Sequence, residues 1–360
     1  MADRYPIKIF IGSIGRRVYL VRWFEQAFSL LGIDGEVHVS DADEFSAGMS
    51  RSTFSHVVPR YEDALYETEM TRLFAEIQPD LFFSVNDYEL NRLAHDGLAL
   101  KFEQIGGAVL SLSQTKHRLV HDKYAMSLEL SKLDIPTPQT VLLSEIDEVC
   151  KLAAIRPQLI IKDRFGSGSS GLKKVSSEDL LAEIRGFGPF GNPSMRKLDR
   201  YIVQPAIRGQ EFGLDLVAPI IPDAHDTAVL ARSKLRMRAG ETDHAESVDS
   251  SVFLETGRQV SAWLNHRGLI DVDVIVDDLG TPFVIDINPR FGGGYPFNHL
   301  SGANVPALYV AQLVGHQKDT LQRYLRYETG VRASKFEEVT LGKADSRRLN
   351  TLRENRNARR

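Results

Sequence analysis

The stretch at residues 284–294, VIDINPRFGGG, restricts the fold more than any other part of this chain. Its first half alternates apolar and polar residues, which predicts a strand with Asp286 and Asn288 on one face. Pro289 ends that strand because proline has no backbone N–H for a sheet, and Arg290 and three glycines follow. A carboxylate, an amide oxygen and a guanidinium this close together suit a divalent cation bound beside a phosphate. By itself, the stretch is also compatible with a buried strand that ends in a polar turn.

Length and composition describe a soluble protein of several domains. The 360 residues predict about two or three domains, and the hydrophobic and charged fractions of 42% and 26% are ordinary. A formal net charge of -4 argues against a general nucleic-acid-binding surface. The apolar run Ile7–Ile11 is too short for a signal peptide, and no run approaches the roughly 20 apolar residues of a membrane span. With Cys150 as the single cysteine, these features predict a cytoplasmic protein without an internal disulfide.

The first part of the chain predicts an α/β domain. A strand at Ile7–Ile11, a turn that contains Gly12 and Gly15, and a helix at Val18–Leu31 form the opening of a nucleotide-binding βαβ unit. The glycines do not complete G-x-G-x-x-G, so the pattern argues against a dinucleotide site here. We expect residues 1–112 to form a Rossmann-like domain.

Polar residues follow a later strand of the same domain. The nearly continuous apolar run at residues 80–85 predicts a buried parallel strand, and Asn86, Asp87 and Glu89 follow its carboxyl end. Ligands bind at this edge in open α/β sheets, so these three residues are candidates for substrate contacts. Asp87 and Glu89 could hold an ammonium group. The alternative is that Asn86 or Asp87 only caps a helix.

A lysine and a glycine–serine loop mark the middle of the chain, after a single helix that we expect at residues 113–134. Lys162 ends a strand that begins at Leu159, and the loop Gly166–Gly171, GSGSSG, leads into a second strand. Such a loop lets the backbone approach a phosphate closely, and its N–H and hydroxyl groups can donate to phosphate oxygens. It is not a Walker A loop, because it lacks G-K-[ST] and opens no helix. The alternative is a flexible hairpin tip.

Charged residues also alternate along later strands. Glu211 and Asp215 share one strand face, which indicates a ribose or cation contact or else an exposed face. A basic row extends into a loop that we expect at residues 235–242, and it suits a phosphate, a substrate carboxylate or a protected strand edge. The basic row consists of Arg232, Lys234, Arg236 and Arg238.

A hairpin is expected to bring acidic residues to the stretch at 284–294. Its strands, at residues 270–276 and 282–287, are joined by a short turn. Their pairing predicts Asp273 beside Asp286. The final segment, residues 341–360, is basic and poor in apolar residues, and we expect a disordered or loosely helical tail. A nucleic-acid or acidic-partner contact is considered only for this tail.

The order of these elements resembles the ATP-grasp superfamily, nearest to the carbamoyl-phosphate-synthase-like branch of carboxylate–amine ligases. The strings that carry the resemblance are Asp122-Lys123, Pro136-Thr137-Pro138, Ile161-Lys162 with the glycine–serine loop, and Ile285 to Phe291. The resemblance implies an α/β fold in which a Rossmann-like pre-ATP-grasp domain (1–112) precedes a two-lobed ATP-grasp fold. The implied α+β lobes are residues 113–205, with linker helices, and residues 206–340, followed by the tail (341–360).

The resemblance also implies an ATP site between the two lobes. Lys123 and Lys162 would contact the phosphates and Glu211 the ribose. Arg290, Lys162 and Arg236 would be catalytic, with Arg290 at the transferring phosphoryl group. The residues implied over the phosphates and around adenine are Gly166, Ser167, Gly168, Ser169 and Gly171, and Gln204, Ala206 and Ile207. The implied ligands of one or two Mg²⁺ ions, for which Mn²⁺ could substitute, are Asp273, Asp286 and Asn288. The implied substrate contacts, besides those of the first domain, are Arg238, Gly292 and Gly293.

Two features depart from the family pattern. Aspartate stands at position 286, where many relatives carry glutamate, and at position 273, where they carry glutamate or glutamine, so the metal geometry is open. Gln204-Pro205 stands where relatives often carry an acidic residue, so the adenine contact is open too.

The implied activity is ATP-dependent ligation of a carboxylate to an amine through an acylphosphate. The expected substrates are a small carboxylate and a small amine, for example amino acids, and a homodimer is expected because dimers are common in relatives. The alternatives are an ATP-grasp kinase and a regulatory protein that binds ATP. A dinucleotide-dependent oxidoreductase is disfavoured by the incomplete glycine pattern.

Overall fold

The computed structural model of the protein describes residues 6–166, 172–180, 198–238 and 240–341. Most of the predicted phosphate loop lies outside the described residues, and so does the tail from residue 342. The loop residues concerned are Ser167, Gly168, Ser169, Ser170 and Gly171. None of the described helices combines the length and apolarity that a membrane crossing needs.

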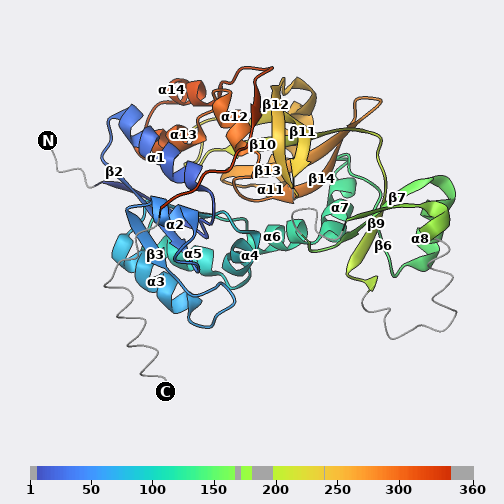
Figure 1. The fold of residues 1–360 in the computed structure, drawn as a ribbon, viewed down its shortest axis with the longest axis horizontal. Helices are drawn as coiled ribbons and strands as arrows, with labels where there is room; N and C mark the ends of the chain where they lie inside the picture. Colours follow the sequence, from blue (N-terminus) through green and yellow to red (C-terminus); the bar gives the residue numbers. More distant parts are fainter. Residues whose placement is uncertain (1–5, 167–171, 181–197, 239, 342–360) are drawn as a thin grey trace.

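The chain begins with a parallel five-stranded sheet in the order β3-β2-β1-β4-β5 (Figure 1). The order reverses between β1 and β4, so the carboxyl ends of these strands form the crevice where open α/β sheets bind ligands. Ile9 and Ile11 pack into one core and Phe10 into another, since helices cover both faces of the sheet. The strands are β1 (Ile7–Gly12), β2 (Gly35–Asp41), β3 (Phe54–Val57), β4 (Leu81–Ser84) and β5 (Ala108–Leu110). The helices are α1 (Val18–Leu31), α2 (Ala47–Arg51), α3 (Tyr66–Ile77), α4 (Asp87–His95) and α5 (Leu98–Ile105).

Two helices, α6 (Gln114–His121) and α7 (Lys123–Lys132), connect this sheet to the rest of the chain (Figure 1). The sequence predicted one helix at residues 113–134, but the structure divides it at Asp122. The Asp122 carboxylate accepts hydrogen bonds from two backbone N–H groups of the next turn and thereby starts α7. It also forms an ion pair of 2.5 Å with Arg164.

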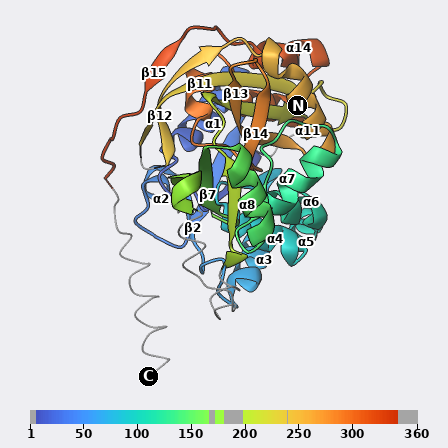
Figure 2. The ribbon, with the colours of Figure 1, turned by 90° about the vertical axis from the view of Figure 1, so that its right-hand side faces the viewer.

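A four-stranded antiparallel sheet in the order β6-β9-β7-β8 forms a lobe that projects to the right in Figure 1 and faces the viewer in Figure 2. This lobe has a core of its own, in which Val149 and Leu152 pack against Leu159 and Val203. Its elements are β6 (Val141–Leu142), α8 (Ile146–Ile155), β7 (Gln158–Asp163), β8 (Lys173–Ser176) and β9 (Tyr201–Pro205).

A six-stranded antiparallel sheet follows, in the order β14-β13-β10-β11-β12-β15. Val260 and Leu264 of α11 pack on one of its faces. The prediction of a loop at residues 235–242 is wrong, because the pairing of β11 continues through Arg238 and that of β12 begins at Glu241. The strands are β10 (Gly209–Ala218), β11 (Ala228–Arg238), β12 (Glu241–Val248), β13 (Gly268–Asp277), β14 (Pro282–Asn288) and β15 (Arg332–Ser334). The helices are α11 (Leu254–Leu264), α12 (Tyr295–Leu300), α13 (Val305–Leu313) and α14 (Lys318–Gln322), with short 3-10 turns at Ser251–Phe253 and Arg323–Leu325.

The largest core joins the first sheet to the helices that follow β14. Phe291, directly after Arg290, packs between Phe83 of β4 and Tyr309 of α13, with ring centroids 5.2 and 5.9 Å away. Phe24 of α1 also contacts this group. The core therefore holds Arg290 at the crevice of the parallel sheet. The predicted fold class, an α/β domain followed by two α+β lobes, is confirmed.

Candidate active site

A pocket of about 240 Å³ lies between the two antiparallel sheets. Its apolar lining includes Ile160 of β7, Ile275 of β13 and Ile285 of β14. Its charged lining residues are Lys123, Lys162, Asp163, Lys174, Glu211, Asp273 and Asp286. This combination suits a ligand with a flat apolar part and several charged groups.

The residues predicted around adenine lie along one edge of this pocket. Gln204, Ala206 and Ile207 line it at the end of β9. The buried Gln204 side chain donates from Nε2 to Thr140 Oγ1 at 2.7 Å. The backbone N–H of Ala206 donates to Gln158 O at 2.9 Å. Both donors are therefore engaged within the four-stranded lobe.

Lys162 extends into the pocket from β7, and its Nζ donates to Ile285 O at 3.2 Å. Burial lowers the pKa of Lys162 to about 8. Asp286 opposes this shift in pKa, whereas the positive charge of Lys123 adds to it. A phosphate bound beside this amine would favour its charged form and restore a higher pKa.

Lys123 is placed by the start of α7, directly after the Asp122 cap. Its Nζ lies 2.8 Å from Asp286 Oδ1. Burial is the largest single effect on each pKa and favours the neutral form, but the hydrogen bond between the two groups and the opposite charges around them together outweigh it. The pKa of Lys123 is therefore raised, and that of Asp286 is lowered by Lys123 and Lys162. The pair stays ionised at neutral pH.

A third lysine lies beside acidic residues of the six-stranded sheet. Lys234 of β11 lies 2.7 Å from both Glu211 Oε1 and Asp273 Oδ1. Burial raises the pKa of Asp273 to about 6, with a contribution from the carboxylate of Asp271, whereas Lys234 opposes the shift. Lys234 thus compensates two carboxylates at the pocket wall.

The three predicted metal ligands gather on the hairpin of β13 and β14. Asp273 pairs with Asp286 across the strands, as predicted, and Asp271 pairs with Asn288. Two carboxylates and an amide oxygen are hard donors of the kind that Mg²⁺ prefers, so the residues fit this ion by type. Among the described residues, no three Asp, Glu, His or Cys side chains form a group that could hold a metal ion. The fit therefore depends on Asn288 and on oxygen atoms of a ligand.

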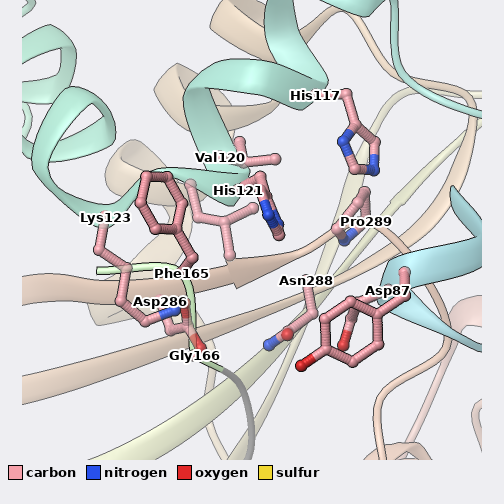
Figure 3. A pocket seen from close by; sticks show the side chains of 12 residues that line it. Asp87, His117, Val120, His121, Lys123, Phe165, Gly166, Asp286, Asn288 and Pro289 are labelled. Atoms are coloured by element: carbon pink, nitrogen blue, oxygen red, sulfur yellow. Dashed lines mark ion pairs between the residues drawn. The ribbon is translucent and has the colours of Figure 1, made fainter. Parts of the chain in front are cut away.

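A smaller pocket of about 30 Å³ adjoins the first, and Lys123 and Asp286 line both. Figure 3 shows His117 and His121, which project from α6 on one side, and Asn288 and Asp87 on the other. The lining residues are Asp87, Tyr88, His117, Val120, His121, Lys123, Phe165, Gly166, Asp286, Ile287, Asn288 and Pro289. The pocket thus lies where the parallel sheet, α6 and β14 meet.

Arg290 links this region to the first sheet. Its Nε and Nη2 each lie 2.6 Å from an oxygen of the Asp87 carboxylate. Nη2 also donates to Asn288 Oδ1 at 3.3 Å. Burial opposes the charge of Arg290, but Asp87 raises its pKa. The forked ion pair fixes the guanidinium beside a predicted metal ligand.

Two predicted substrate residues of the first sheet line neither pocket. Asn86 caps α4, since its Oδ1 accepts from two backbone N–H groups of the first turn. Glu89 is buried, accepts a hydrogen bond of 2.7 Å from Tyr66 and has Ser84 as a second partner. Burial raises the pKa of Glu89. Of the three predicted substrate residues Asn86, Asp87 and Glu89, Asp87 alone lines the smaller pocket.

The end of the basic row also lies outside both pockets. The side chains of Arg236 and Arg238 are 57% and 64% exposed and pair with Asp243 and Glu337. A register shift between Lys234 and Arg236 interrupts the alternation that the sequence suggested. Lys234 therefore pairs with Glu211 and Asp273 at the wall of the larger pocket, whereas Arg236 pairs with Asp243 outside it.

The glycines after Arg290 pack against buried charged side chains. Arg232 is 1% exposed and pairs with Asp271. A Cβ at residue 292 would lie 2.3 Å from Asp271 Cγ, and one at residue 294 would lie 2.1 Å from Arg232 Nε. Gly292 and Gly294 therefore leave room for this ion pair, and Gly293 lines neither pocket.

Sequence reasoning did not select several polar residues that line the pockets. Among them are Lys174 in the larger pocket and His117 and His121 in the smaller one. Lys234 was considered only as a member of the basic row. The spacing of four residues between the two histidines, which places side chains on one helix face, was the available signal.

Comparison with protein families gives two matches along the chain. Residues 120–294 match the ATP-grasp domain family, and residues 9–110 match the PylC-like N-terminal domain family. The chain belongs to the ATP-grasp superfamily. The resemblance carried by the sequence motifs is thus confirmed for this ATP-grasp protein.

One curated relative of this ATP-grasp protein is an uncharacterized protein from Methanocaldococcus jannaschii. It is 22% identical over 194 residues, which cover 53% of this chain. The match spans 46% of the relative, that is, less than half of its length.

Solved structures share the fold at low sequence identity. One is the biotin carboxylase domain of Hydrogenobacter thermophilus 2-oxoglutarate carboxylase in complex with MgADP. It has a TM-score of 0.64 at 12% sequence identity, and the match covers 87% of this chain and 71% of the chain in that structure. An L-amino acid ligase from Bacillus licheniformis has a TM-score of 0.64 at 18% identity, with 90% and 78% covered. N5-carboxyaminoimidazole synthetase from Staphylococcus aureus, complexed with ADP, has a TM-score of 0.62 at 14% identity, with 87% and 78% covered.

Proposed function

We propose that this ATP-grasp protein is a ligase that joins a small carboxylate to an amine and converts ATP to ADP and phosphate. The observation that carries the proposal is the set Lys123, Lys162, Asp273 and Asp286 at one end of the larger pocket. Lys123 and Asp286 also line the smaller pocket, so a phosphoryl group held by them would adjoin a second binding space.

In this proposal ATP occupies the larger pocket. Its base lies near Gln204 to Ile207, its ribose near Glu211, and its phosphates near Lys123 and Lys162. The lining supports this orientation, because apolar side chains and charged side chains are both present. Bound phosphates would raise the pKa of Lys162 from about 8 and keep both lysines charged.

Asp273, Asp286 and Asn288 would hold Mg²⁺ in this enzyme, since their oxygens are donors of the right type. The ion would neutralise charge on the phosphate oxygens. Two of the similar solved proteins contain ADP, one of them as its magnesium salt, which supports this choice of cofactors.

The chemistry follows from the poor reactivity of a carboxylate, whose leaving group would be oxide. A carboxylate oxygen attacks the γ-phosphorus, the bond from that phosphorus to ADP breaks, and an acylphosphate forms. The amine nitrogen then attacks the acyl carbon, phosphate leaves with its electron pair, and the nitrogen loses a proton. Lys162 and Arg290 would stabilise negative charge on the transferring phosphoryl group.

We further propose amino acids or similar small molecules as substrates, and the fold shared with an L-amino acid ligase supports this choice. The proposed domains are residues 1–112, 113–205 and 206–340, which the three separate sheets support. Action in the cytoplasm and a homodimer complete the proposal; the similar biotin carboxylase domain is described as a dimer.

The test is a screen of amino-acid pairs for ADP release, with mass spectrometry of the products. Release that requires both a carboxylate and an amine, and that Lys162→Ala abolishes, is the expected result. A phosphorylated product without any amine would replace the ligase with an ATP-grasp kinase. If ATP binds but no pair releases ADP, and Asp286→Ala leaves the biological activity intact, a regulatory ATP-binding protein is the better assignment.

A further inference from the structure

The smaller pocket contains two histidines that the proposed reaction does not use. His117 and His121 lie one helical turn apart on α6, and both line the pocket (Figure 3). His117 is 3% exposed, and neither of its ring nitrogens has a hydrogen-bond partner among the described residues. Buried polar atoms are almost always paired, so a ligand group that pairs with these nitrogens is expected.

The charges around the pocket favour a ligand that donates hydrogen bonds over an anion. The charged residues that line it are two carboxylates, Asp87 and Asp286, and one ammonium group, Lys123. Lys123 is paired with Asp286, and Asp87 is paired with Arg290. No cation among these described residues is left to hold a substrate carboxylate.

Both histidines are neutral under ordinary conditions. Burial lowers the pKa of His117 to about 4. Burial and the charge of Lys123 also lower the pKa of His121, against the opposing effect of Asp87. A neutral imidazole has one nitrogen that accepts a hydrogen bond. Two such acceptors, one turn apart, match two N–H bonds of a single amino group.

The position and size of the pocket agree with a reacting group. Because Lys123 and Asp286 line both pockets, a group held here adjoins the phosphate end of the larger one. Its volume of about 30 Å³, against about 240 Å³ for the larger pocket, leaves room for a small group such as an amino group rather than a second large ligand.

We infer that this smaller pocket binds the amino group of the attacking substrate, whose N–H bonds are accepted by His117 and His121. The inference rests on the proposed function and adds to it the place where the amine binds. In this inference the carboxylate substrate binds at a different position, which must lie closer to the γ-phosphate than the smaller pocket does.

The test uses His117→Phe and His121→Phe, which keep a planar ring and remove the nitrogens. The amino-acid pair that releases most ADP in the screen serves as the probe. We expect the KM for the amine to rise about three- to tenfold in each variant, as for the loss of one hydrogen bond. The KM for the carboxylate should stay within twofold. His316→Phe is the matched control, because His316 also has a buried ring nitrogen with no partner in the described part of the chain but lies outside the pocket.

Positional isotope exchange in ATP labelled at the β–γ bridge reports acylphosphate formation without the amine, and it should be unchanged in both variants. An unchanged amine KM in both, a rise in the carboxylate KM instead, or a loss of isotope exchange would each overturn the inference and leave the ligase proposal standing. Absence of both isotope exchange and ADP release in the unaltered protein would overturn the proposed function itself.

Discussion

Replacing Arg232 tests how far the stability of the protein depends on the buried charges near the site. The side chain of Arg232 is 1% exposed, lies 2.9 Å from Asp215 and also pairs with Asp271. Asp215 is fully buried and accepts a hydrogen bond of 2.6 Å from Asn298. Arg232→Met keeps much of the side-chain volume but leaves two carboxylates without a cation. Removing one partner of a buried ion pair lowers the free energy of unfolding by about 3–5 kcal/mol.

The loss of stability in Arg232→Met should depend on pH. The pKa of Asp215 determines whether the loss grows or shrinks as the pH rises. Burial raises the pKa of Asp215 to about 6 although Arg232 opposes the shift. Without Arg232 this pKa rises further above its value of about 3.9 in the unfolded chain. A group whose folded pKa is raised destabilises the folded state as pH rises, by up to about 1.4 kcal/mol per pH unit. Arg232→Met should therefore be more harmful at pH 8 than at pH 5.

Urea unfolding followed by tryptophan fluorescence at both pH values measures this effect. Arg236→Met is the control from the same strand, because the Arg236 side chain is 57% exposed and pairs with Asp243. Asp243 is buried, but the Arg236 guanidinium lies largely in water, so we expect a smaller loss of stability for this variant than for Arg232→Met. A loss for Arg232→Met that is no larger than for Arg236→Met at pH 8, or that grows toward pH 5, would refute the reasoning.

Three further predictions concern the site. Lys162→Ala and Arg290→Ala should each lower turnover at least about 10²-fold, because each removes one electrostatic stabiliser; steady-state rates within a few fold of the unaltered protein would contradict these roles. ATP binding should take up a proton near pH 8, since phosphates raise the pKa of Lys162 from about 8, and the affinity should fall as pH rises through that value. Calorimetry in two buffers of different ionisation heat measures the uptake, which Lys162→Met should remove; equal heats in both buffers would contradict it. Gly294→Ala should lower the free energy of unfolding by about 1–3 kcal/mol, because its Cβ would lie 2.1 Å from Arg232 Nε. An unchanged thermal midpoint would show that the pair can move aside.

The meeting of Asp273 and Asp286 was predicted from the alternation along each strand and from the short turn between the strands, which are both local in the sequence. The register set by the turn alone would place Ile285 opposite Asp273, and a register shift between Asp273 and Val274 brings Asp286 to that position instead. The same reasoning found the strand and helix that begin the parallel sheet, where apolar runs and glycine turns are close in sequence. The order of motifs then supplied the fold of the two lobes.

Contacts between distant segments could not be predicted in this way. Arg290 and Asp87 are 203 residues apart, and nothing in either segment specifies the other as its partner. Lys234 and Arg236 look equivalent in an alternating row, but a register shift between them separates their surroundings. The positions of His117 and His121 at the site also depend on where α6 is placed by the packed sheets rather than on its own sequence.

The packing of Phe291 against Phe83 and Tyr309 has a consequence for protein engineering. Phe83 belongs to the parallel sheet, and Phe291 and Tyr309 belong to the segment that follows β14. A chimera that replaced only residues 1–112 with those of another ATP-grasp protein would separate side chains that pack as one core. Recombination that carries residues 289–313 together with the first sheet should keep this core intact, whereas the four-stranded lobe, with its separate core, can be exchanged by itself.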